Sequence, residues 1–116
     1  MNIEAHIIQW LNSLDLGCRA YADVPPEYPE EFVQVIRIGG QRDSVAIDRP
    51  RIALQLWAGS NERAAELAYQ LDELVITGLR QDSRISKVSR TALYSYSGSD
   101  SGHARYQIEL DIVCVI

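Results

Sequence analysis

The plainest pattern in the chain is RYQIELDIVCV at residues 105–115. Apolar side chains occupy every second position, from Tyr106 through Ile108, Leu110 and Ile112 to Cys114, and the intervening positions begin with glutamine, glutamate and aspartate. A period of two over this length predicts an antiparallel strand with one buried face.

The segments before this strand predict a partner for it. Residues 97–102, SGSDSG, have the composition of a turn. Residues 85–88 and 91–96 indicate a strand with a break or a bulge between its halves. We therefore expect residues 91–115 to form a β-hairpin.

Two segments have helical periodicity instead. In residues 61–77 Ser60 is a suitable N-cap, Glu62 lies in the first turn, where the helix dipole favours it, and Gly78 is the expected stop. The apolar stripe of this helix is Ala64, Leu67, Ala68, Leu71, Leu74 and Val75. Residues 3–14 predict a second helix with Ile3, Ile7, Leu11 and Leu14 on one face, ended by Gly17.

The remaining segments predict the middle of the sheet. Residues 32–38, FVQVIRI, are rich in β-branched side chains, and Gly39-Gly40 is expected to end that strand. Residues 41–49 are polar and predict a loop, after which Pro50 introduces a strand at 51–57. Residues 18–22 are a weaker strand candidate, and residues 23–31 contain three prolines that preclude a regular helix or a central strand.

The resulting order is helix, three strands, helix, two strands. This order predicts an α+β fold with a mostly antiparallel four- to five-stranded sheet and two helices packed on one face. At 116 residues the chain is expected to form a single domain over residues 1–116.

Composition narrows the function. The net charge of −5 does not suit binding to a nucleic-acid backbone, and all of the 11 basic residues except Lys87 are arginine. Arginine is enriched at protein interfaces, although a GC-rich genome produces the same bias. No apolar run is long enough for a membrane span, and the N-terminus does not have the pattern of a secretory signal, so we expect a cytoplasmic protein.

The residues that usually carry chemistry are scattered. Cys18 and Cys114 lack metal-ligand spacing, and His6 and His103 are isolated, so we expect no metal and no cofactor. The loop at Gly39-Gly40 lacks the lysine and the helix that a phosphate-binding loop requires. No nucleophile elbow is present, and we expect no catalytic activity.

Adjacent carboxylates do not change this expectation. Glu30-Glu31 borders the proline loop and is most simply a solvated edge, whereas Asp72 and Glu73 are neighbours on a helix and point in different directions.

The order of these pieces resembles the tail terminator proteins of long-tailed bacteriophages, also called minor tail or tail completion proteins. The matching parts, across nearly the whole chain, are a short N-terminal helix, a proline-rich loop, FVQVIRIGG, DRPRIALQLWAGS, the alanine-rich helix NERAAELAYQLDELV, a tyrosine-bearing strand, a Gly/Ser/Asp turn and RYQIELDIVCV. The stretch from DRPR through Trp-Ala into that helix is the most telling part.

The resemblance implies a structural protein without enzymatic activity or cofactor. Members of the family form hexameric rings that cap the head-proximal end of the tail tube, stop its polymerisation and offer a surface to head-completion proteins. The implied partners are other copies of the chain, the major tail tube protein and a head-completion or connector protein, with no membrane and no specific nucleic-acid binding. The implied location is the host cytoplasm during assembly and then the virion tail.

Two groups of residues are the candidate contacts for subunits or tube. A ring needs two different complementary patches on each subunit. The loop at residues 39–49 offers charges of both signs in Arg42, Asp43, Asp48 and Arg49, although it is also compatible with a mobile solvent-exposed loop. The tyrosine candidates are Tyr28, Tyr94, Tyr96 and Tyr106. For Tyr28, packing on its own proline-rich loop is the simpler interpretation than contact with another subunit or the tube.

Other functions remain open at this point. A different head–tail connector or head-closure protein shares the same assembly logic. An unrelated small α+β ligand-binding domain would show a closed apolar pocket with a few convergent polar groups.

Overall fold

The computed structural model describes residues 1–27, 29–96 and 104–116. Its elements follow the order α1 (Ile3–Ser13), β1 (Arg19–Tyr21), β2 (Phe32–Arg42), β3 (Ile47–Ala58), α2 (Asn61–Gly78), a short 3₁₀ helix (Leu79–Gln81), β4 (Ile85–Ser95) and β5 (Ala104–Val115). This confirms the expected α+β fold and the order of its helices and strands.

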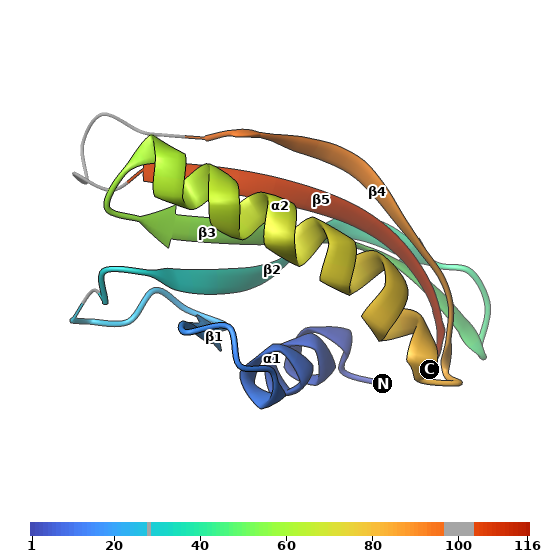
Figure 1. Cartoon of the computed structure of the whole chain (residues 1–116). Helices are drawn as coiled ribbons and strands as arrows, with labels where there is room; N and C mark the ends of the chain where they lie inside the picture. The colour runs from blue at the N-terminus through green and yellow to red at the C-terminus, as the bar shows by residue number, and fades with distance from the viewer. Residues whose placement is uncertain (28, 97–103) are drawn as a thin grey trace.

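The strands form one sheet in the order β1-β2-β3-β5-β4. All neighbours are antiparallel except β1 and β2, which are parallel. Both helices cover the same face, with α2 lying along β3 and β5 and α1 lying below β2 (Figure 1). The opposite face, here called the open face, carries no helix formed by the described residues.

The core lies between the helices and the sheet. Ile3, Ile7 and Leu11 enter it from α1 at a spacing of four residues, as predicted. The buried α2 side chains are Ala64, Leu67, Ala68, Leu71 and Val75. Alternate residues of the two central strands complete the core: Ile52, Leu54 and Leu56 from β3, and Ile108, Leu110, Ile112 and Cys114 from β5.

Both helix starts are capped by side chains. Asn2 Oδ1 accepts a hydrogen bond from the Ala5 amide at 3.1 Å, and Ser60 Oγ accepts one from the Arg63 amide at 3.1 Å. Each contact satisfies an amide that has no partner within the helix. The predicted role of Ser60 is therefore confirmed.

Of the two predicted glycine stops, the one at Gly78 is confirmed as the last residue of α2, and the one at Gly17 was wrong. Gly78 has φ −75°, an ordinary helical value, and the chain continues into the 3₁₀ helix. A Cβ at Gly78 would lie 2.3 Å from Trp10 Cζ2, so this glycine lets α2 approach the indole ring of α1. Helix α1 ends at Ser13, and Gly17, with φ 78°, lies further along in the connection to β1.

Gly39-Gly40 was also expected to end a strand, and this too was wrong. Strand β2 runs through both glycines, and its pairing with β3 shifts by one residue between Arg37 and Gly39. Gly40 has φ 90°, and a Cβ there would lie 2.1 Å from the Arg49 carbonyl oxygen. Glycine is required because the bulged strand approaches the β3 backbone closely here.

The predicted 41–49 loop is mostly a hairpin. Arg42 pairs with Asp48, and Gln41 pairs with Arg49, so the β2–β3 connection occupies only residues 43–46. Pro50 lies inside β3 rather than before it. The β3–β5 ladder has no pairs at positions 49 and 50, which lets it accommodate a residue without an amide hydrogen.

The predicted irregularity in residues 85–96 is confirmed as two bulges within one continuous strand, β4. The pairing with β5 shifts at Ser86 and again at Thr91. Their hydroxyl groups donate to carbonyls of β5, Ser86 to Val113 at 3.3 Å and Thr91 to Glu109 at 3.2 Å. Bulges of this kind twist an edge strand and oppose pairing with another chain along its length.

Candidate assembly surfaces

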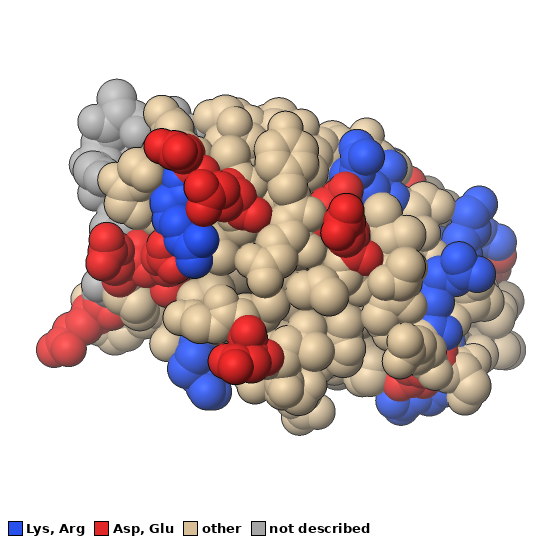
Figure 2. Space-filling view, viewed as in Figure 1, with Lys and Arg blue, Asp and Glu red and all other residues tan. Residues whose placement is uncertain are grey.

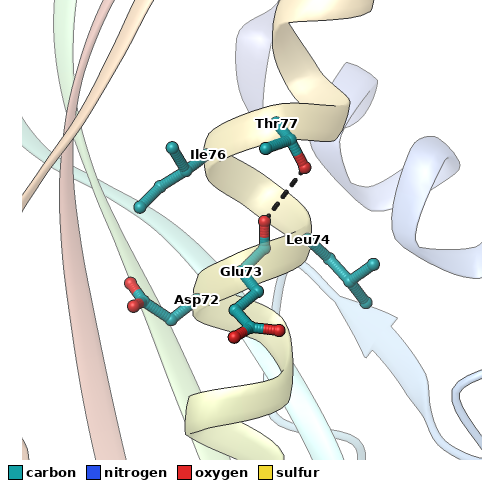
Figure 3. Close-up of a pocket in the computed structure, with 5 residues that line it drawn as sticks. All are labelled: Asp72, Glu73, Leu74, Ile76 and Thr77. Atoms are coloured by element: carbon teal, nitrogen blue, oxygen red, sulfur yellow. Dashed lines mark hydrogen bonds between the residues drawn. The ribbon is translucent and has the colours of Figure 1, made fainter.

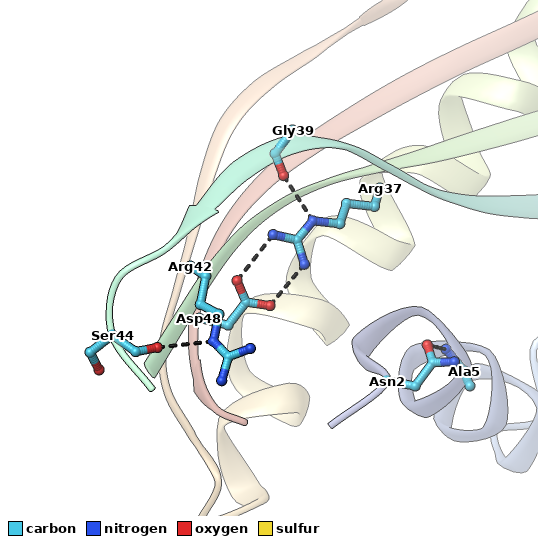
Figure 4. A network of polar contacts seen from close by, with 7 residues as sticks. All are labelled: Asn2, Ala5, Arg37, Gly39, Arg42, Ser44 and Asp48. Atoms are coloured by element: carbon cyan, nitrogen blue, oxygen red, sulfur yellow. Dashed lines mark hydrogen bonds and ion pairs between the residues drawn. The ribbon is translucent and has the colours of Figure 1, made fainter. Parts of the chain in front are cut away.

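An ion pair joins β2 to β3 close to the turn of their hairpin. Arg37 donates from Nη1 and Nη2 to the two carboxylate oxygens of Asp48 at 2.8 and 3.0 Å, and from Nε to the Gly39 carbonyl at 3.1 Å (Figure 4). The Asp48 side chain is only 13% exposed. The hydrogen bond from Arg37 lowers the pKa of Asp48, which keeps the carboxylate charged. Asp48 therefore secures the hairpin rather than facing solvent.

The hairpin tip is fixed by short polar contacts. Arg42 donates from Nε to the Ser44 carbonyl and from Nη2 to the Val45 carbonyl, both at 3.1 Å. Ser44 Oγ accepts from the amides of Ala46 and Ile47 at 3.2 and 3.1 Å. These bonds hold the backbone of the turn while the Val45 side chain is 87% exposed.

The other two predicted charges pair with each other. Arg49 Nε lies 3.1 Å from Asp43 Oδ2, and the side chains are 55% and 53% exposed. An ion pair this exposed stabilises the fold by about 0–1 kcal/mol. It can therefore exchange for contacts with another molecule at little cost.

Further exposed apolar side chains surround the tip. The Ile116 amide donates to the Ala46 carbonyl at 2.9 Å, and the Val115 amide donates to the Arg84 carbonyl at 2.9 Å. Val115 is 38% and Ile116 45% exposed. We call Val45, Ala46, Val115 and Ile116, together with the flanking Arg42, Arg49 and Arg84, the tip patch.

The predicted tyrosine group is divided between the two faces of the sheet. Tyr106 pairs with Leu56 of β3 and packs against the core on the helix-covered side. Tyr94 and Tyr96 lie on the open face in edge-to-face contact, with ring centroids 6.4 Å apart. Tyr28 lies outside the described residues.

Tyr94 belongs to a hydrogen-bonded group on the open face. Its hydroxyl donates to Glu109 Oε2 at 2.6 Å and accepts from Gln107 Nε2 at 2.9 Å, and Gln55 Nε2 donates to Gln107 Oε1 at 2.9 Å. The bond to Glu109 raises the pKa of Tyr94 to about 12. This group fixes side chains across β3, β5 and β4.

A row of aromatic rings and one arginine crosses the same face, and sequence reasoning missed it. Phe32 stacks on Trp57 with centroids 5.0 Å apart, and Tyr21 meets Phe32 edge-on at 6.1 Å. The Arg105 guanidinium lies 4.6 Å from the centroid of the Trp57 ring and 5.2 Å from that of Tyr96. Phe32 and Trp57 are 0% and 5% exposed, so this part of the row is a second small core and not a binding surface.

The solvent side of α2 is a further candidate surface that the sequence analysis did not select. Its exposed residues are Glu62, Glu66, Tyr69, Gln70, Glu73 and Thr77. They recur at helical spacing in NERAAELAYQLDELVIT, opposite the apolar stripe, which is the signal that could have identified them. A surface hollow lies along the C-terminal half of this side, lined by Asp72, Glu73, Leu74, Ile76 and Thr77 (Figure 3).

A second hollow opens on the other face of the sheet, where the β3–β5 ladder is interrupted. It is lined by Gly40, Gln41, Arg49, Arg51, Asp111, Ile112 and Val113. Arg51 of β3 donates to both carboxylate oxygens of Asp111 of β5 at 2.8 and 3.1 Å, so the charges of these two lining residues are paired with each other.

The groups considered for metal or thiol chemistry are placed as follows. Cys18 and Cys114 are both free, and burial raises the pKa of each thiol. His6 Nε2 lies 3.2 Å from Asp82 Oδ2, and His103 lies outside the described residues. Within residues 1–27, 29–96 and 104–116 no three His, Cys, Asp or Glu side chains are grouped to hold a metal ion. None of the helices in these ranges has the length and hydrophobicity to cross a membrane.

No protein-family model matches the chain, and neither does any curated protein sequence.

Proposed function

We propose that this chain is a structural subunit of a phage tail terminator, a ring that caps the head-proximal end of the tail tube and presents the head-joining surface. The observation that carries the proposal is the β2–β3 hairpin, whose turn is held by hydrogen bonds and exposes the Val45 side chain. Because Arg42 and Ser44 hold the turn and the Arg37–Asp48 pair joins the two strands next to it, the hairpin presents an apolar side chain without having to fold on contact.

The arrangement of surfaces suits closed assembly. A ring is built from unlike patches that meet head to tail, so each subunit needs two different contact regions. The tip patch lies at one end of the molecule, beside the C-terminal residue, whereas the exposed side of α2 belongs to the helix layer (Figure 1). The bulged edge strand β4 opposes strand-to-strand polymerisation into fibres.

The proposal assigns partners and location. The chain contacts other copies of itself, the major tail tube protein and a head-completion protein, and its role is non-enzymatic and needs no cofactor. It assembles in the host cytoplasm and remains in the virion tail. Apolar side chains rimmed by arginines are typical of such protein contacts.

Imaging of tail tubes tests the proposal. Tubes assembled from a major tail tube protein are mixed with the purified chain and examined by negative-stain electron microscopy. We expect additional density at one end of each tube. Failure to find the protein at either end would reject the terminator role.

A pair of variants tests the hairpin assignment. Val45→Asp places a charge on the tip and should abolish binding to the tube end, whereas Ile38→Asp makes the same type of change at a 44% exposed position nearer the hairpin base. We expect Ile38→Asp to bind as the unmodified chain does. Equal binding by both variants would reject the hairpin tip as the contact element, provided that circular dichroism shows both to be folded.

A further inference from the structure

Two surfaces of this chain have complementary shape and charge. Figure 2 shows acidic side chains over α2 and at the end of the molecule where α2 begins. Basic side chains are more frequent toward the opposite end, where the two termini lie. The tip patch belongs to the basic end, since Arg42, Arg49 and Arg84 flank its apolar residues. Arg49 is paired with Asp43 and Arg84 with Asp82, so Arg42 is the flanking arginine without an ion pair to a described residue.

We infer that the tip patch of one copy docks into the hollow on the solvent side of α2 of a second copy. The inference rests on the proposed function and specifies the contact that joins neighbouring subunits. The following observations support it from each side of the contact.

The α2 hollow is lined by both apolar and acidic side chains. Leu74 and Ile76 are half-buried and lie on opposite sides of the helix, with Glu73 and Thr77 exposed between them (Figure 3). Thr77 Oγ1 donates to the Glu73 carbonyl at 3.1 Å, which leaves the Glu73 carboxylate directed outward. Tyr69, 61% exposed, lies one helical turn before Glu73, and tyrosine is one of the residue types enriched among interface hot spots.

Some of the acidic charges on this helix face are paired and others are not: Asp72, which lines the hollow, lies 2.8 Å from Arg90 Nε through its Oδ1. Among the described residues Glu62 and Glu73 form no ion pair, and Glu66 reaches Arg63 only at 3.3 Å. Arg63 is already engaged by the carboxylate of Glu31 through two hydrogen bonds. Glu73, the carboxylate in the lining of the hollow that forms no ion pair with a described residue, is therefore the charge that attracts a basic partner.

The tip patch has the opposite composition. Val45 projects furthest into solvent, and Arg42 beside it forms no ion pair with the described residues. The ion pair Arg49–Asp43 is exposed on both sides and can rearrange. Burial of Val45 against Leu74 and Ile76 would supply affinity, and pairing of Arg42 with Glu73 would fix the orientation.

Directed disulfide formation tests the contact. Val45→Cys and Thr77→Cys are made as separate proteins, each with Cys18→Ser, so that the only other thiol is Cys114, which is 2% exposed. The two are mixed under mild oxidation, alone and on tail tubes, and linked peptides are identified by mass spectrometry. Asp15→Cys in place of Thr77→Cys is the control, because it is exposed but lies away from α2.

We expect a linkage between position 45 of one copy and position 77 of the other, and none to position 15. Linkage to position 15 at equal yield, or no linkage to position 77 in solution or on tubes, would overturn the inference. Capped tubes without a 45–77 linkage would contradict the inference and leave the proposed function standing. A 45–77 linkage in a protein that never binds tube ends would support the contact between copies and contradict the proposed function.

Charge exchange provides an independent test. Replacing Arg42 and Arg49 by Glu, or Glu66 and Glu73 by Arg, should each raise the concentration needed for self-assembly by about tenfold or more in sedimentation velocity. A chain carrying all four substitutions restores opposite charges at the contact and should recover assembly. Continued failure of this chain, when circular dichroism shows it folded, would contradict the charge pairing.

Discussion

Gly78→Ala should destabilise the protein, although glycine to alanine within a helix usually does the opposite. Gly78 has φ −75°, so alanine fits its backbone and would on propensity alone stabilise the fold by about 1 kcal/mol. The added Cβ would lie 2.3 Å from Trp10 Cζ2 and 3.1 Å from Cη2. Real Cβ contacts are longer than this, so the ring or the helix must move.

The sign follows from comparing the two effects. Overpacking of this kind costs about 1–3 kcal/mol. The Trp10 ring is rigid and packs against the core, so it cannot yield as the end of a flexible side chain would. We expect Gly78→Ala to lower the free energy of unfolding by about 1 kcal/mol net, which is the overpacking cost less the gain in helix propensity.

Urea unfolding followed by far-ultraviolet circular dichroism measures this. In a Trp10→Ala background the clash is absent, and Gly78→Ala should then stabilise by about 0.5–1 kcal/mol. Gly39→Ala is the matched control, because a Cβ there meets no atom within 4 Å and φ is not in the left-handed region. Stabilisation by Gly78→Ala in the unmodified chain would refute the packing argument.

Three other changes probe the hairpin and the open face. Gly40→Ala combines a left-handed φ of 90° with a backbone clash, and should lower the free energy of unfolding by about 2 kcal/mol or more in the same urea assay. Arg37 lowers the pKa of Asp48 in the folded state, so their pairing stabilises the fold at pH values above the carboxyl's unfolded pKa. This stabilisation is lost as the pH falls through the folded pKa. Asp48→Asn should therefore make the free energy of unfolding depend less on pH over this acidic range. The bond to Glu109 raises the pKa of Tyr94 to about 12, so ultraviolet titration should show one tyrosine that ionises at higher pH than an ordinary tyrosine. Tyr94→Phe should remove this step, and Glu109→Gln should move it to lower pH.

Local pattern was sufficient for most of the fold. The alternation in residues 105–115 and the helical spacing of Ile3, Ile7 and Leu11 each report burial directly, so β5 and α1 followed from the sequence. The glycines were harder, because a glycine pair marks a turn and a bulge equally well. Only the pairing of Gly40 with Pro50 across the hairpin distinguishes the two.

The same long-range pairing explains what was missed at the candidate surfaces. Asp48 looked like a free loop charge, and it is held by Arg37 because the bulge sets which residues of β2 face the helices. Tyr106 is in phase with Ile108 and so belongs to the buried side, which the sequence could have shown. The row through Trp57 and Arg105 depends on β3 and β5 being neighbours, which no local pattern reveals.

Tube elongation tests the central proposal most directly. Preformed tail tubes are incubated with this protein, further tube protein is added, and the tube lengths are measured by electron microscopy. The proposal predicts that tubes stop growing at the capped end with the unmodified chain and continue to grow with Val45→Asp. Unimpeded growth in the presence of the unmodified, folded chain would contradict it.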